Sequence, residues 1–406
     1  MKPKLSQKHE SLPHFSSDHL PNLERSHDSL RNRSCIFFNR GTCHSCKFSP
    51  SNHLETSKTK QNKTEQLKHS LKLIDFSAFH HSSPTIRSAC AKSILHGFQT
   101  AGFIYLSNFG IDPTSVQSAF STSAKFFARP QDEKDSLGWT TPEANRGYVA
   151  HGREKVSCLT TAEEVAKLKL QVPDLKESFE IGREGEEGHA NNWPQEGQVS
   201  SGQEIDEAKA FKDGMQHFFG LCKELHVEVM RAIAVGMGLD ASYFDSYTDM
   251  GDNTLRLLHY PSTPKKVFDS NALQVRAGEH TDYGSITLLF QDDRGGLQVK
   301  SPSGEFVNAT PIPGTVVVNA GDLLARWSND TIKSTLHRVV EPKGRMTEGE
   351  GEDERYPARY SIAYFCNPNF SSYIDAIPGT FETEDKRKYQ GINSGQYLVQ
   401  RLAATY

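Results

Sequence analysis

Turn residues divide the second half of the chain into short apolar segments, and this pattern constrains the fold more than any other feature of the sequence. The segments are rich in β-branched and aromatic residues, which favour strands. Turn signals at 292–296 and 313–314 keep the segments short. Many short strands at close spacing are typical of a barrel or a double-sheet roll. The segments expected to be strands are 255–260, 286–290, 296–300, 315–319, 337–340 and 360–365.

The first half of the chain alternates between strand and helix signals instead. Residues 71–76 and 103–106 read as strands. Between them, apolar residues recur every four positions from Ile86 to Phe98, as on one face of an amphipathic helix. Asp112-Pro113 is typical of a helix start, and a long apolar stripe predicts a helix over 204–236. We therefore expect an N-terminal α/β module in front of the β-rich half.

These patterns also predict how the chain is divided. Residues 1–66 are rich in Ser, His, Asn and Lys and show little apolar periodicity, which is typical of a disordered extension. The later parts are expected to be an N-terminal module over 67–200, a long supporting helix in 201–249, a β core over 250–370 and a C-terminal helical segment over 371–406.

Cys35, Cys43, Cys46 and His53 interrupt the N-terminal extension. Three thiolates and an imidazole suit a structural zinc ion. The phrase 40–43 resembles CCCH zinc fingers, which bind RNA. The two residues between Cys43 and Cys46 are fewer, and the six before His53 are more, than those fingers normally use. A disordered tail with chance cysteines is the alternative interpretation.

Charge, hydropathy and cysteine usage narrow the class of protein. The formal net charge of −4 argues against a nucleic acid as the main partner of the whole chain. No run of about 18 apolar residues occurs, so we expect no membrane span, and the N-terminus lacks the apolar region of a secretory signal. The 7 cysteines do not form a disulfide framework in 406 residues, so we expect free thiols and a cytoplasmic location.

Three residues in the β-rich half have the chemistry of metal ligands: His280, Asp282 and His337, which we call the triad. The stretch 278–290 reads as a single strand, on which His280 and Asp282 share one face because they are two residues apart. Two imidazoles and one carboxylate leave one face of a metal open, as in non-haem Fe(II) oxygenases. Zinc can bind the same donors, but the helical H-E-x-x-H motif of zinc hydrolases does not occur in the sequence.

A second constellation follows the triad. Arg359 and Ser361 lie two apart in a predicted strand and therefore share one face. A guanidinium fork beside a hydroxyl forms a cradle for a carboxylate. A buried arginine needs a partner, and an oxo-acid cosubstrate would serve as one.

Together these residues carry a family resemblance. The chain resembles the 2-oxoglutarate/Fe(II)-dependent dioxygenases of the isopenicillin N synthase-like group from about Leu71 to Tyr406. The resemblance implies a fold that is mainly β with flanking helices, a double-stranded β-helix (jelly-roll) barrel with an N-terminal α/β module. The phrases that carry it are Glu279-His280-Thr281-Asp282-Tyr283-Gly284, His337-Arg338-Val339 and Arg359-Tyr360-Ser361.

The resemblance also implies roles for individual residues. The triad would bind Fe(II), Arg359 would pair with the distal carboxylate of 2-oxoglutarate, and Ser361 would donate a hydrogen bond to it. Tyr260 falls where the family often has a tyrosine near the cosubstrate. The family's Asn-x-Tyr phrase reads Leu258-His259-Tyr260 here, so a core tyrosine is the alternative.

The implied activity is oxidation of a small organic metabolite by hydroxylation, desaturation or ring closure. It uses Fe(II), 2-oxoglutarate and O₂, with ascorbate as an optional reductant, and releases succinate and CO₂. No protein partner is evident from the sequence. Three alternatives remain open: an isopenicillin N synthase-type oxidase that uses no 2-oxoglutarate, a zinc-dependent RNA-binding protein with a fused barrel, and a barrel kept as a scaffold without catalysis.

Four further residues near these phrases are candidates for lesser roles. Arg146, Tyr148 and Phe179 lie in phrases that resemble the substrate-facing part of the family, and packing is the alternative for each. Arg338 follows His337 on a predicted strand, so its side chain is expected to point away from the metal and to serve the structure.

Overall fold

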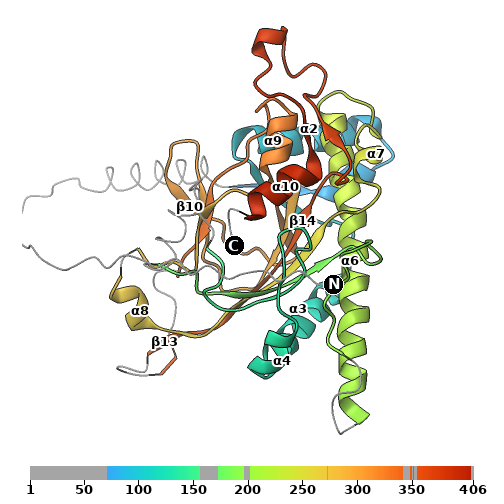
Figure 1. The fold of residues 1–406 in the computed structure, drawn as a ribbon. Helices are drawn as coiled ribbons and strands as arrows, with labels where there is room; N and C mark the ends of the chain where they lie inside the picture. Colours follow the sequence, from blue (N-terminus) through green and yellow to red (C-terminus); the bar gives the residue numbers. More distant parts are fainter. Residues whose placement is uncertain are drawn as a thin grey trace, which may run out of the picture. The chain divides into compact units, whose positions relative to one another are not determined.

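The computed structural model describes residues 71–155, 172–195, 202–271, 273–341, 348–349, 351 and 354–403. All of them belong to one unit, Lys58–Tyr406, whose elements are drawn in Figure 1. The predicted extension 1–66 and its cysteine-histidine patch lie outside the described residues. The division of the chain into modules stays a prediction.

An eight-stranded sheet forms one wall of the barrel, in the order β1-β2-β11-β8-β14-β5-β4-β3. Its neighbouring strands pair antiparallel, except that β1 pairs parallel with β2. The strands are β1 (Lys72–Asp75), β2 (Phe103–Ser107), β3 (Gly147–Val149), β4 (Glu177–Gly182), β5 (Thr254–Tyr260), β8 (Ile286–Gln291), β11 (Thr315–Ala320) and β14 (Arg359–Cys366).

A four-stranded sheet in the order β10-β9-β12-β7 forms the other wall. Its strands are β7 (Ala277–His280), β9 (Leu297–Lys300), β10 (Phe306–Asn308) and β12 (His337–Val339). One cluster of buried side chains draws on both sheets, with Leu258 and Ala363 from the larger and Leu297 and Val339 from the smaller. Two sheets that share a core in this way form the predicted jelly roll. Two short pairs complete the strands: β6 (Thr263–Pro264) with β13 (Arg355–Tyr356), and β15 (Tyr373–Ile374) with β16 (Ile392–Asn393).

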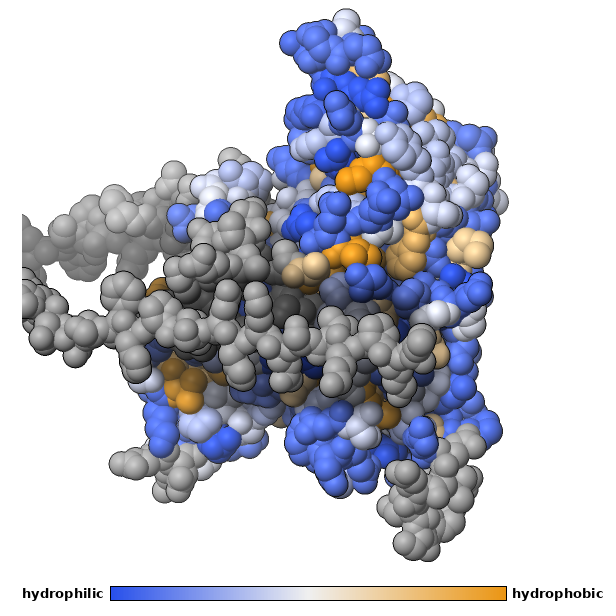
Figure 2. All heavy atoms as spheres, in the orientation of Figure 1, coloured by the Kyte–Doolittle hydropathy of each residue, from blue (hydrophilic) through white to orange (hydrophobic). Residues whose placement is uncertain are grey.

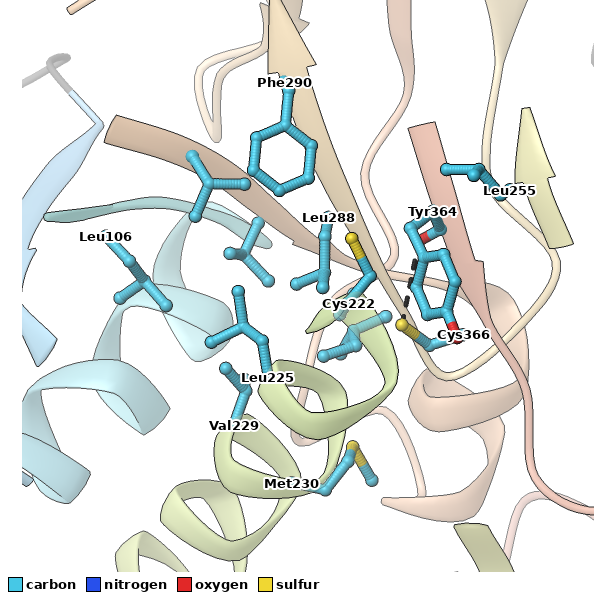
Figure 3. Packing of buried hydrophobic residues seen from close by; sticks show 14 of the residues in the cluster. Leu106, Cys222, Leu225, Val229, Met230, Leu255, Leu288, Phe290, Tyr364 and Cys366 are labelled. Carbon is cyan, nitrogen blue, oxygen red and sulfur yellow. Dashed lines mark hydrogen bonds between the residues drawn. The ribbon is translucent and has the colours of Figure 1, made fainter. Parts of the chain in front are cut away.

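The long helix α6 covers the larger sheet and runs beside α2, as Figure 1 shows in light green and blue. Figure 3 shows Cys222 and Leu225 of α6 lying against Leu288 of β8 and Tyr364 of β14. Each large apolar side chain buried here contributes about 1.5–3 kcal/mol. The helices are α2 (Pro84–Thr100), α3 (Pro113–Phe127), α4 (Gln131–Ser136), α6 (Gly202–Gly236), α7 (Asp245–Thr248), α8 (Lys265–Asp269), α9 (Asp322–Trp327) and α10 (Ser394–Ala403), with 3-10 turns η1 (Phe76–His80) and η3 (Glu384–Lys386).

The predicted helix start at Asp112-Pro113 is confirmed. The Asp112 carboxylate accepts a hydrogen bond of 2.7 Å from the backbone N–H of Thr114, and Pro113 occupies the first turn. A cap of this kind stabilises a helix by about 1 kcal/mol because it satisfies a backbone donor that has no partner inside the helix.

The prediction of one continuous strand over 278–290 is wrong. Strand β7 ends at His280, β8 begins at Ile286, and the two belong to different sheets. The chain turns between them at Gly284, where an added Cβ would lie 2.3 Å from the carbonyl oxygen of Cys366. Only glycine allows so close an approach. The turn was missed because the β-branched residues that follow it have high strand propensity, which made the whole segment look like one strand.

Figure 2 shows a face on which hydrophilic side chains surround scattered apolar ones in the part of the chain that is coloured. No helix among the described residues is long and apolar enough to cross a membrane. Scattered apolar side chains are normal on a protein surface and mark no particular site.

Candidate metal centre

The turn after β7 and the pairing of β7 with β12 bring the triad together. His337 lies opposite His280 in the antiparallel register of these strands. The Asp282 Oδ1 atom is 3.7 Å from Nε2 of His337 and 4.0 Å from Nε2 of His280. One ligand atom from each residue lies within 4.8 Å of the others, a spacing that suits a single metal ion.

Backbone carbonyls fix the orientation of both imidazoles. His280 Nδ1 lies 2.8 Å from the carbonyl oxygen of Gly278, and His337 Nδ1 lies 3.2 Å from that of Thr335. A carbonyl oxygen only accepts hydrogen bonds, so each Nδ1 carries the proton. The lone pair of each Nε2 is therefore left for a metal, as in most protein metal sites.

The carboxylate of Asp282 is oriented in the same way. Its Oδ2 atom accepts hydrogen bonds from Thr287 Oγ1 at 2.6 Å and from Asn319 Nδ2 at 2.7 Å. Oδ1 is left facing the two histidines. Neither Thr287 nor Asn319 was identified from the sequence: the pattern predicts one continuous strand for Thr287 and Asp282, and Asn319 lies far along the chain.

The protonation states also suit a metal. Burial lowers the pKa of His280 to about 3, and the neighbouring His337 adds to this effect, so the imidazole is neutral. Burial works to raise the pKa of Asp282, but the two histidines and its hydrogen bonds outweigh burial, so its pKa lies below the ordinary value. Two imidazole nitrogens and one carboxylate oxygen thus converge on one point, and the donors present fit Fe(II).

Arg359 and Ser361 lie beside the triad on β14, on one face of the strand as predicted. Arg359 is 2% exposed, and its guanidinium donates to Ser361 Oγ at 3.0 Å and to the Gly295 carbonyl at 2.8 Å. It also stacks over the ring of Tyr260, with 4.8 Å to the ring centroid. The contacts of Arg359 with described residues are the Gly295 carbonyl, the Ser361 hydroxyl and the Tyr260 ring, none of them a carboxylate at ion-pair distance, so the fork can receive an incoming acid.

A cavity of about 1030 Å³, which includes the open space at its mouth, contains the triad, Arg359, Ser361 and Tyr260. We call the part formed by these residues the metal wall. A second part, the ionic wall, consists of Glu154, Lys176 and Arg256.

The ionic wall is a chain of buried charges. Arg256 forms ion pairs with Glu180 at 2.6 Å and with Glu154 at 3.1 Å, and Lys176 pairs with the other oxygen of Glu154. Burial works to raise the pKa of Glu154, but Arg256 and Lys176 lower it to about 2. These residues were not identified from the sequence as part of the site. One feature could have indicated them, because Arg256 is a charged residue within the apolar strand β5.

The lesser candidates fall elsewhere. Phe179 packs between Phe126 and Phe211 in the hydrophobic core, and the Tyr148 hydroxyl bonds to Glu177. Arg146 pairs with Glu186 at 2.5 Å. None of the three lines the cavity with the triad, as the described residues define it, so packing is the interpretation that the structure favours.

Arg338 is turned away from the metal, as expected. Its guanidinium pairs with Glu279 at 3.0 Å and stacks over Phe306, with 4.0 Å to the ring centroid. The side chain links neighbouring strands of the smaller sheet and has a structural role.

Sequence comparison matches the same two halves of the molecule. The profile of the 2OG-Fe(II) oxygenase superfamily matches residues 251–368, and the profile described as non-haem dioxygenase in morphine synthesis N-terminal matches 71–197. The 2-oxoglutarate-Fe(II) type oxidoreductase ppzD of Metarhizium rileyi is 32% identical over 341 residues, which is 83% of this chain and 91% of that protein. The chain belongs to the 2OG-Fe(II) oxygenase superfamily.

Solved structures of a protein from Neurospora crassa are similar to this oxygenase as well. The full-length Neurospora protein in complex with alpha-KG and thymine is 63% identical, with a TM-score of 0.74, over 83% of this chain and 97% of that one. The same protein in complex with alpha-KG and 5-formyluracil is 62% identical, with a TM-score of 0.71, over 82% of this chain and 96% of that one.

These relationships decide between the alternatives left open by the sequence. The protein is a 2-oxoglutarate-dependent dioxygenase, an oxidoreductase with the jelly-roll fold, and its cofactor and cosubstrate are Fe(II) and 2-oxoglutarate. They favour this function over an oxidase that uses no 2-oxoglutarate and over an RNA-binding module. The complete set of three metal-binding side chains also argues against a scaffold without catalysis.

Proposed function

We propose that this oxygenase oxidises the carbon attached to C5 of a thymine-class pyrimidine base. The observation that carries the proposal is the pair of ligands in the Neurospora crassa structures, thymine and 5-formyluracil. Thymine is 5-methyluracil, so these ligands differ only in the oxidation state of one carbon. An enzyme of this class inserts oxygen at such a carbon, and the identities of 62–63% support carrying the substrate class over.

The residues of the metal wall receive their roles in the same proposal. His280 and His337 through Nε2, and Asp282 through Oδ1, bind Fe(II). Arg359 and Ser361 hold the distal carboxylate of 2-oxoglutarate. Bound Fe(II), with 2-oxoglutarate and O₂, supplies the oxidant that removes hydrogen from the C5 substituent.

Tyr260 acts through Arg359 in this proposal. Its ring supports the flat guanidinium from one side, which holds the fork in the plane that a carboxylate needs. The two residues lie opposite each other in the register of β5 and β14, so the contact follows from strand pairing.

The rest of the cavity suits a flat, polar ring. Phe365 and Tyr283 offer aromatic surface, and Arg256 lies over Phe365 with 5.2 Å to the ring centroid. Arg256 and Asn145 can donate hydrogen bonds, and Glu154 can accept them. The edge of a uracil ring carries two carbonyl acceptors and two N–H donors, so this lining can satisfy both kinds. A largely apolar lining also disfavours water near the oxidised carbon.

The proposal is tested with purified protein, Fe(II), 2-oxoglutarate and thymine in air. We expect succinate and 5-hydroxymethyluracil to appear together, followed by 5-formyluracil, as measured by mass spectrometry. Uracil, which lacks the methyl carbon, is the matched control and should give neither oxidised base nor thymine-level succinate. Equal succinate with thymine and with uracil would contradict the proposed substrate.

We further infer a cytoplasmic location. The three cysteines of the described residues, Cys90, Cys222 and Cys366, are buried free thiols, as is usual in a reducing compartment. Fractionation of cells that express a tagged protein checks this, and recovery with organelles or medium would contradict it.

A further inference from the structure

A second hollow adjoins the cavity that holds the triad. It has an empty volume of about 610 Å³, and we call it the outer cavity. Three residues line both hollows: Asn145, Thr254 and Leu398. These residues therefore form a partition between the inner cavity and the outer one.

The two polar members of the partition are held in place by hydrogen bonds. Asn145 donates through Nδ2 to Thr254 Oγ1 at 3.4 Å and accepts through Oδ1 from Trp139 Nε1 at 3.1 Å. Both residues are buried. Leu398 makes no such bond through its side chain, so the apolar part of the partition depends on the position of helix α10.

Helix α10 is fixed at both ends. At its start, the N–H groups of Ser394 and Gly395 donate to the carbonyls of Ser372 at 2.9 Å and Phe370 at 3.0 Å. Near its end, Arg401 pairs with Asp322, whose carboxylate also accepts from Thr281 Oγ1 at 3.0 Å. Thr281 is the residue between two members of the triad, so the helix is tied to the turn that forms the metal centre.

The lining of the outer cavity differs in chemistry from the partition. It includes the exposed carboxylate of Glu143, the ion pair between Arg146 and Glu186, and the imidazole of His189. These groups can donate and accept hydrogen bonds with the hydroxyls of a sugar. Leu398 stands between such groups and the metal centre.

We propose that Leu398 is a specificity-determining residue that restricts the substrate to a base without a sugar. The inference rests on the proposed function, because it concerns thymine and its N1-substituted forms. A nucleoside carries on N1 a pentose of about the size of the base, and a pentose directed at the partition would meet Leu398. Shortening Leu398 would join the two hollows and give a pentose both space and polar partners.

The test compares three truncations on the same helix. Leu398→Ala removes part of the partition, Leu402→Ala removes the same atoms from a leucine that lines the inner cavity alone, and Val399→Ala shortens a residue that lines the outer cavity alone. Each holoenzyme is assayed with thymine, 1-methylthymine and thymidine. The quantity compared is kcat/KM for each N1-substituted base relative to thymine.

We expect kcat/KM for thymidine, relative to thymine, to rise about tenfold or more in Leu398→Ala. Removing a few carbon atoms from an apolar pocket usually changes the discrimination between two substrates by at least this factor. The two matched variants should leave the ratio within about twofold of wild type. Calorimetric titration with the same compounds, carried out without O₂, should show the same gain in thymidine affinity for Leu398→Ala.

The inference is overturned if Leu398→Ala still oxidises thymine but its thymidine-to-thymine ratio is unchanged. It is also overturned if Leu402→Ala raises the ratio equally, or if wild type already oxidises thymidine with the same kcat/KM as thymine. If Leu398→Ala does not fold, Leu398→Val replaces it, with a smaller gain expected and an unchanged ratio again decisive against the proposal. Failure of the proposed function looks different, because wild type would then oxidise no thymine at all.

Discussion

The metal wall and the ionic wall line one cavity but are built on different principles. In the metal wall, two imidazoles and a single carboxylate are oriented by backbone carbonyls and short hydrogen bonds. In the ionic wall, full charges from separate segments neutralise one another out of water. Substitutions in the metal wall should therefore lower turnover and leave the protein folded. Substitutions in the ionic wall should mainly lower the free energy of unfolding.

The largest effect is expected for the triad. Replacing His280, Asp282 or His337 by alanine removes a metal ligand, and turnover should fall by roughly 10³-fold or more. The melting temperature should stay near that of wild type, because no ion pair of the ionic wall is touched. Fe(II) binding, succinate release and melting are measured together, with the exposed His217→Ala as control. Full turnover in any of the triad variants would contradict the assignment of that ligand.

The ionic wall should respond in the opposite way. Glu154→Ala leaves Lys176 buried without its carboxylate, and breaking a buried pair of this kind costs about 3–5 kcal/mol in the free energy of unfolding. The control is Glu133→Ala, which breaks the half-exposed pair with Arg129 and should cost about 1 kcal/mol or less. Urea unfolding measures both. Equal costs for the two variants would remove the distinction between the walls.

The pH dependence of stability gives a second measure of the ionic wall. The pKa of Glu154 is lowered from 4.5 to about 2, so its contribution is fully present above pH 4.5 and is lost as the pH falls towards 2. This loss is on the order of 3 kcal/mol. Glu154→Gln should be less stable than wild type at neutral pH and should lose less stability between pH 4.5 and 2. Parallel curves for the two proteins in urea titrations would show that Glu154 does not carry the acid sensitivity.

The two walls also differ in how much of them could be predicted from the sequence. Arg359 and Ser361 lie two residues apart on one strand, so their shared face was readable from local spacing. His280 and Asp282 were also found from their spacing, although the turn after β7, and not a strand, brings Asp282 to His280. Glu154, Lys176 and Arg256 come from three distant segments, and only tertiary packing joins them. Charges of this type read as ordinary surface residues until their burial is known.

The same distinction between local and long-range information applies to the prediction of the fold. Strands, the long helix and the cap at Asp112 follow from local patterns, and the family resemblance supplied the jelly roll. The turn between β7 and β8 depends on the approach of Gly284 to Cys366, a residue far along the chain, and propensity carries no information about such a contact. The partition at Leu398 was unpredictable for the same reason, because a leucine on an amphipathic helix reads as packing.

A smaller effect is expected inside the metal wall for the cosubstrate cradle. Arg359→Lys keeps the charge but loses the planar fork, so iron binding should persist while the KM for 2-oxoglutarate rises about 10- to 100-fold. Arg338→Lys is the matched control, since that guanidinium also lies on a strand of the site but points away from the metal. Steady-state kinetics with varied 2-oxoglutarate decide the matter. An unchanged KM in Arg359→Lys would place the cosubstrate elsewhere.

The smallest effect should come from the support of Asp282. Asn319→Ala removes one of the two hydrogen bonds to Oδ2, and Thr287 Oγ1 still holds the carboxylate at 2.6 Å. We expect Fe(II) affinity to fall about tenfold, the lower end of the range for groups that orient a metal ligand. Asn308→Ala, on the edge strand β10, is the control and should leave the affinity unchanged. A loss of stability with unaltered Fe(II) affinity would show that Asn319 serves packing, and the metal wall would then depend on the ligands and Thr287 alone.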